Sequence, residues 1–111
     1  KIYRAPHARL VQLHDALWRA NRILVDIGLH TGDLSHAAAT KHLKDNVGFT
    51  KSRAAADVNW YTAAPTVPMS YLLGREKVSA LFAAHRGSLR QFNDWLLSHG
   101  AVPFSWFRSN R

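Results

Sequence analysis

The sequence predicts an all-α protein of about five helices. Apolar residues recur at steps of three and four along most of the chain, which is the spacing of one helix face. No stretch shows the alternation of apolar and polar residues that a half-buried β-strand requires. Glycine and proline divide the chain at intervals of helical length. We therefore interpret residues 1–111 as a single helical region.

The first helix is expected over residues 6–27. One set of its apolar residues forms a stripe at three- and four-residue steps: Leu10, Leu13, Leu17, Leu24 and Ile27. Such a stripe predicts the face that the helix buries. Gly28 is expected to end the helix, because glycine tolerates the left-handed backbone of a helix C-terminus. Residues 29–34 then form a loop that carries His30.

Four further helices follow, and three of them have a side chain placed to cap their start. These are Ser35, Thr50 and Ser88. The helices are expected over residues 36–47, 51–63, 68–86 and 89–99. Pro68 suits the first turn of its helix, where the missing N–H would be unpaired in any case. We expect the aromatic residues of the tail, 101–111, to cover the core.

The chain carries 15 Lys and Arg against seven Asp and Glu, for a formal net charge of +8. A basic balance is typical of proteins that bind nucleic acid, anionic lipid or an acidic partner. The charges are scattered, which favours instead a domain whose acidic complement lies elsewhere in the protein. The absence of cysteine excludes disulfides and thiolate chemistry. No apolar run approaches the roughly 20 residues of a transmembrane helix, so none is predicted.

Seven histidines raise the question of a metal site, but their spacing argues against one. His7 and His14 are two helical turns apart, about 10 Å along the axis. His36 and His42 are six residues apart and fall on different faces of a helix. Neither pair has the i, i+4 spacing of an HExxH zinc helix. We expect no metal site built from this chain alone.

Several polar positions allow both a structural and a functional interpretation. Arg22 and Asp26 stand at i, i+4, which fits either a surface ion pair or a brace for the loop with His30. His30 itself is either solvated or functional. Tyr71, near a helix start, could present its hydroxyl to a pocket or pack in the core. Gly74 costs about 1 kcal/mol relative to alanine in a helix, so a closely packed neighbour or ligand is expected there.

Three stretches, residues 17–30, 65–74 and 92–103, together resemble one bacterial family. They match the patterns R-x-x-R-x-x-x-D-x-G-[LI]-H, then P-x-x-x-x-S-Y-x-x-G, then F-[HN]-D-x-L-L-x-x-G-x-[VIL]-P. In order and spacing they are similar to the C-terminal region of the family called domain of unknown function 885. The resemblance covers nearly the whole chain. The start at Lys1, without an initiator Met, also leads us to expect a fragment of a larger protein.

The resemblance implies a helical, zincin-like metallopeptidase architecture. In it, an HExxxGH-type helix and a downstream Glu helix would hold zinc, and both would lie upstream of Lys1. The chain would then be the substrate-cleft portion of a zinc-dependent peptidase-like hydrolase and would not be catalytic alone. Its implied partners are the upstream part of the same protein and a peptide-like substrate. A cytoplasmic location and export as a lipoprotein are both compatible with the resemblance.

The resemblance also implies roles for individual residues. His30 and Tyr71 would donate hydrogen bonds to the scissile carbonyl as it becomes an oxyanion. Arg22 and Asp26 would brace His30, and Arg19 would meet a substrate carboxylate.

The chain departs from the family pattern between Pro65 and Ser70. Many members have Gly-Gln where this chain has Thr66-Val67-Pro68, so a side chain that could touch substrate is missing and substrate preference stays open. The alternative to a hydrolase is a non-catalytic basic helical module that binds nucleic acid or an acidic partner. A degenerate family member retained for binding is a third hypothesis.

Overall fold

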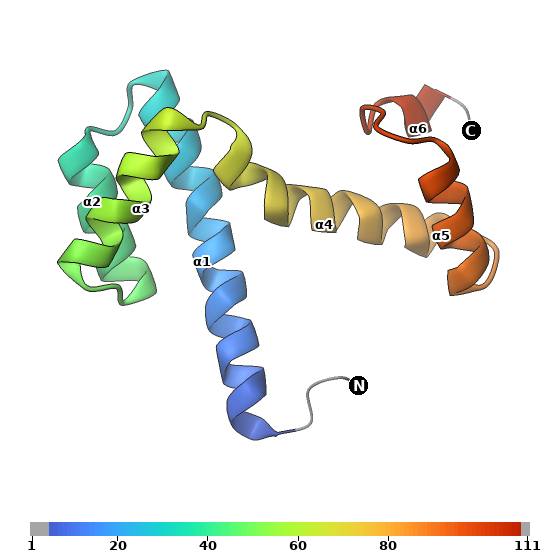
Figure 1. The fold of residues 1–111 in the computed structure, drawn as a ribbon, viewed down its shortest axis with the longest axis horizontal. Coiled ribbons are helices and arrows are strands. Elements are labelled where there is room, and N and C mark those ends of the chain that lie inside the picture. The colour runs from blue at the N-terminus through green and yellow to red at the C-terminus, as the bar shows by residue number, and fades with distance from the viewer. Residues whose placement is uncertain (1–4, 110–111) are drawn as a thin grey trace. The chain divides into compact units, whose positions relative to one another are not determined.

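A computed structural model describes residues 5–109, and these residues form helices and connecting turns without a β-strand (Figure 1). In chain order the helices are α1 (Pro6–Thr31), α2 (His36–Val47), α3 (Lys51–Ala63), α4 (Val67–Ala84), α5 (Leu89–Ser98) and the short α6 (Trp106–Ser109). The predicted all-α class is confirmed. The chain divides into two compact units, with the boundary between Leu73 and Gly74. No helix in the described part is long and apolar enough to cross a membrane.

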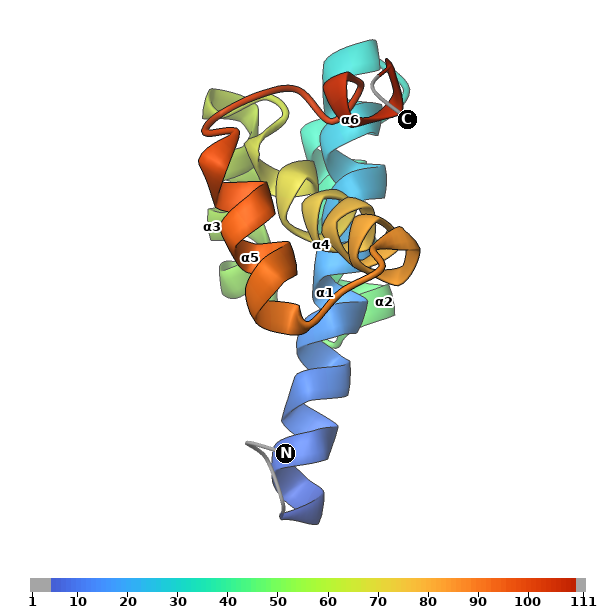
Figure 2. The ribbon, with the colours of Figure 1, turned by 90° about the vertical axis from the view of Figure 1, so that its right-hand side faces the viewer.

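The first unit is built on α1, α2 and α3. Helix α2 packs against both α1 and α3, and α3 also contacts α1 (Figures 1 and 2). The buried side chains that form its core are Val25, Ala39, Leu43, Val47, Ala54, Val58 and Tyr61. Trp18, Leu29 and Phe49 are partly buried and pack against this cluster. The core therefore packs the C-terminal half of α1 against two shorter helices that also pack on each other.

The three predicted capping residues are confirmed. Ser35 accepts a hydrogen bond from the backbone N–H of Ala38, and Thr50 accepts one from Arg53. Ser88 and Gln91 form a reciprocal capping box at the start of α5. Each cap satisfies backbone donors that a helix start would otherwise leave unpaired.

The predicted end of the first helix is wrong, because α1 continues through Gly28 to Thr31. Gly32, with φ 85°, is the left-handed residue that ends it. Gly28 is buried inside the helix, and a Cβ atom there would lie 2.6 Å from Cδ1 of Leu34. Its lack of a side chain serves this close approach of Leu34. His30 accordingly lies in the last helical turn and not in a loop.

The apolar stripe of the first helix is exposed, contrary to the prediction. Leu10, Leu13, Leu17, Leu24 and Ile27 are 44% to 69% exposed. The face that α1 buries carries Val25 together with three polar residues: Asn21, Arg22 and Asp26. Hydropathy alone assigns polar side chains to the surface, whereas Asn21 and Asp26 find hydrogen-bond partners inside the fold and Arg22 lies among aromatic rings. The N-terminal part of α1 also extends beyond α2 and α3 (Figure 1).

The second unit is held together by aromatic contacts. Phe92, which is 2% exposed, lies with its ring centroid 5.1 Å from that of Phe82. The Trp95 ring lies 5.2 Å from that of Phe107, a tail residue that is buried. Phe104 and Trp106 of the tail remain 39% and 52% exposed, so the tail covers this unit only in part.

Candidate functional site

Asp26, on the buried face of α1, is 1% exposed and connects α1 to the start of α4. Its Oδ1 accepts the backbone N–H of Thr66 at 3.3 Å, and its Oδ2 accepts that of Met69 at 3.1 Å. Thr66 directly precedes α4 and Met69 is the third residue of that helix. Pro68, between them, has no N–H to satisfy. Asp26 thus caps the N-terminus of α4 from another helix, where the backbone dipoles favour a negative charge.

Thr66 has a φ of 71°, which places it in the left-handed region. A β-branched residue rarely adopts this conformation, because its side chain crowds the backbone. Strain of this kind persists where surrounding contacts hold it in place, and the Asp26 carboxylate is one such contact.

His30 follows Asp26 by one turn of α1 and contacts it twice. Its Nδ1 lies 2.9 Å from Oδ1 of Asp26 and 2.8 Å from the Asp26 carbonyl oxygen. Both neighbours are oxygen acceptors, so Nδ1 carries the proton and donates to them. Nε2 is then the ring atom left to act on a ligand, and the side chain is 31% exposed. Asp26 is thus in direct contact with the His30 ring, and its role as a brace stays a prediction.

Arg22 and Asp26 do not form the surface ion pair that their spacing allows. Arg22 is 5% exposed and, within the described residues, has no hydrogen bond or ion pair. Its guanidinium carbon instead lies among aromatic rings, at 5.2 Å from the centroid of Trp18 and 5.5 Å from those of Trp60 and Tyr61. We call these three rings with Tyr71 the aromatic cage. The Asp26 carboxylate instead contacts the start of α4 and His30, which explains why it does not form an ion pair with Arg22.

Tyr71 completes the aromatic cage from the second turn of α4. The centroid of its ring lies 4.5 Å from the guanidinium carbon of Arg22. The residue is 53% exposed, so the interpretation of Tyr71 as a core residue is wrong. Within the described residues its hydroxyl has no hydrogen-bond partner, and it is free to meet a ligand. At Gly74 a Cβ atom would have no neighbour within 4 Å, so the close neighbour expected there is not supplied by the described residues.

Arg19, predicted to meet a substrate carboxylate, already has an acidic neighbour. Its Nη1 lies 3.2 Å from Oδ2 of Asp15 and donates to the Asp15 carbonyl at 3.0 Å. The pair is partly exposed, and such pairs contribute about 0 to 1 kcal/mol. A ligand would compete with Asp15 for this cation.

The structure therefore joins Arg22, Asp26 and His30, along one face of α1, to Tyr71 of α4. Sequence reasoning missed the aromatic cage because aromatic residues beside apolar neighbours are typical of a core.

One member of the aromatic cage, Tyr61, is buried. Trp18 Nε1 donates to the Tyr61 hydroxyl at 3.1 Å, and burial raises the pKa of Tyr61 to about 12. That hydroxyl in turn donates to Asp57 at 3.2 Å.

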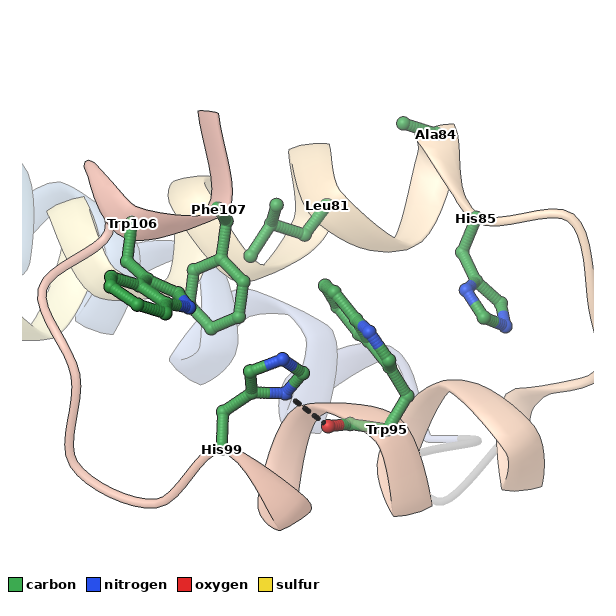
Figure 3. Close-up of a pocket in the computed structure, with 7 residues that line it drawn as sticks. All are labelled: Leu81, Ala84, His85, Trp95, His99, Trp106 and Phe107. Carbon is green, nitrogen blue, oxygen red and sulfur yellow. Dashed lines mark hydrogen bonds between the residues drawn. The ribbon is translucent and has the colours of Figure 1, made fainter. Parts of the chain in front are cut away.

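The second unit contains a separate pocket of about 340 Å³ (Figure 3). It is lined by Leu81, Ala84, His85, Trp95, His99, Trp106 and Phe107. The Nδ1 of His99 donates to the Trp95 carbonyl at 2.7 Å, the dashed line of Figure 3. Among the described residues, the lining holds no carboxylate to pair with His85 and His99. Across the described residues, no group of three or more His, Asp or Glu could hold a metal ion.

A model of the family described as "Bacterial protein of unknown function (DUF885)" matches residues 1–110. No curated protein and no solved structure matches the chain.

Proposed function

The chain belongs to the bacterial family DUF885, and from that premise we propose that it forms the His–Tyr wall of the substrate cleft in a zinc-dependent, peptidase-like hydrolase. The observation that carries the proposal is the role of Asp26. One buried carboxylate holds Nδ1 of His30 and also the start of α4, two residues before Tyr71. A single group thus positions both residues that the proposal needs.

Hydrolysis of an amide puts negative charge on the carbonyl oxygen in the transition state. Donors that are already positioned stabilise this charge without reorganisation. The Tyr71 hydroxyl can donate directly. His30 donates from Nε2 when both ring nitrogens are protonated, while the Asp26 carboxylate holds Nδ1. The two residues together would form one side of an oxyanion site.

A bound zinc ion would supply an activated water for attack on the carbonyl. Since the described residues offer no metal-binding group, its ligands would come from elsewhere in the natural protein. The contribution of this chain is limited to holding and orienting the substrate carbonyl.

The test uses the intact natural protein with a library of internally quenched peptides. Tyr71→Phe should lower kcat by roughly 10²-fold or more, the scale of losing one oxyanion donor. Ser70→Ala is the matched control, because the neighbouring Ser70 hydroxyl is occupied by the Val67 carbonyl of its own helix. An unchanged kcat in Tyr71→Phe would remove Tyr71 from the mechanism.

The zinc content of the same preparation separates an active hydrolase from a degenerate one. The proposal expects close to one zinc per protein and loss of hydrolysis on chelation. A protein with no zinc and no hydrolysis of any library member would refute it.

A further inference from the structure

Arg22 is a buried cation without a counter-charge among the described residues. Its Nε is fully buried and has no hydrogen-bond partner. Asp26, one turn away, directs its oxygens to Thr66, Met69 and His30. The four rings of the aromatic cage attract the guanidinium through their faces, but they accept no hydrogen bonds in the plane of its N–H groups.

Two other arginines in the same unit show what Arg22 lacks. Arg19 and Arg53 also lie over the Trp18 ring, at 5.6 and 5.1 Å from its centroid. Each has a carboxylate four residues away in sequence and 3.2 Å away in space: Asp15 for Arg19 and Asp57 for Arg53. Arg22 is the most buried of the three and is the one without such a partner in the described part of the chain.

We infer that Arg22 is a binding site for a carboxylate. A guanidinium presents parallel N–H donors that match the two oxygens of a carboxylate. Water is largely excluded around it, which strengthens the attraction to an incoming anion. The apolar faces of the cage favour a carboxylate attached to an apolar or aromatic group. Tyr71 is half-exposed and its ring centroid lies 4.5 Å from the guanidinium carbon, so a group from solvent can contact this ring.

Two sources share this chemistry: a ligand with a free carboxylate, such as a peptide C-terminus, and an Asp or Glu side chain elsewhere in the natural protein. The inference does not depend on hydrolysis, so its test measures binding and not turnover. The probes are N-acetyl-L-phenylalanine and its amide, which differ in charge and are nearly equal in shape. Calorimetry on the intact protein gives the affinity for each.

If the ligand supplies the carboxylate, the acid should bind more tightly than the amide by at least roughly 30-fold. Arg22→Gln should remove that preference. If Arg22→Gln does not fold, Arg22→Lys replaces it in the test, because it keeps a positive charge in the aromatic cage. Arg22→Lys should reduce the preference for the acid, because an ammonium lacks the planar pair of N–H donors. Arg53→Lys is the matched control, since Arg53 also lies over aromatic rings but is paired with Asp57. It should leave the preference unchanged.

If the protein supplies the carboxylate, neither probe should be preferred. The Arg22 N–H groups should then show NMR coupling across hydrogen bonds to an Asp or Glu carboxyl carbon, lost in Arg22→Lys. Absence of both the preference and the coupling would overturn the inference while leaving the proposed hydrolase intact. A preference for the acid in a protein without hydrolytic activity would support the inference and count against the proposed function.

Discussion

The Asp26 carboxylate gives the sharpest test of the structure, through the substitution Asp26→Asn. The change keeps the shape of the side chain and removes its charge and one of its two acceptors. In the native arrangement Oδ1 accepts from Thr66 and His30, and Oδ2 accepts from Met69. Asparagine has one oxygen, so it can serve only one of these two positions.

The magnitude follows from that geometry. With its oxygen in the place of Oδ1, asparagine keeps Thr66 and His30 and turns an N–H toward that of Met69. One hydrogen bond to a charged acceptor is lost, worth about 1.5–3 kcal/mol, and one buried donor is left unpaired, which costs about 1–3 kcal/mol. Because asparagine is neutral, the variant does not bury a charge, and this offsets part of the lost stability. We expect a net loss of about 2–4 kcal/mol in the free energy of unfolding.

Urea unfolding of the intact protein measures this loss, and hydrogen exchange at the Met69 amide locates it. The matched control is Asp15→Asn, on the same helix, where a partly exposed carboxylate contacts a cation four residues away. That change should cost about 0–1 kcal/mol. A loss for Asp26→Asn no larger than the control, or an unchanged exchange rate at Met69, would refute the capping role of Asp26.

Two further predictions concern packing and pH. In urea unfolding, the free energy of unfolding of Gly28→Ala should be lower than that of Gly74→Ala by about 1–3 kcal/mol. Both variants gain helix propensity, but only the alanine at position 28 meets a side chain, that of Leu34. Equal free energies of unfolding would contradict the close approach of Leu34 to Gly28. The raised pKa of Tyr61 predicts that stability falls as pH rises from 10 to about 12, since the unfolded tyrosine loses its proton first. In Tyr61→Phe the urea midpoint should fall less steeply over that range, and an equally steep fall would refute the assignment.

The helices could be predicted from sequence where the signal is local. Ser35, Thr50 and Ser88 mark helix starts through hydrogen bonds that span three residues, and all three are confirmed. The end of α1 could not be predicted in the same way. Gly28 and Gly32 both suit a helix C-terminus, and the choice depends on Leu34, which packs against Gly28 only after the chain has turned.

The candidate site could be predicted as residues but not as an arrangement. His30 lies one turn from Asp26 on the same helix, so their contact follows from helical spacing. Tyr71 lies near them only because the backbone at the start of α4 donates hydrogen bonds to the Asp26 carboxylate. No local sequence pattern predicts that contact. The burial of Arg22 is hidden for a related reason: hydropathy places arginine outside, whereas tertiary contacts surround this one with rings.

The cap that Asp26 provides also has a consequence for the order of folding. Its partners Thr66 and Met69 are 40 and 43 residues away in sequence, and α2 and α3 lie between. Closing such a loop costs chain entropy before the contact repays it. We therefore expect the first turn of α4 to form late, after α1, α2 and α3 have assembled. Substitutions at Asp26 should then mainly accelerate unfolding and leave the refolding rate almost unchanged.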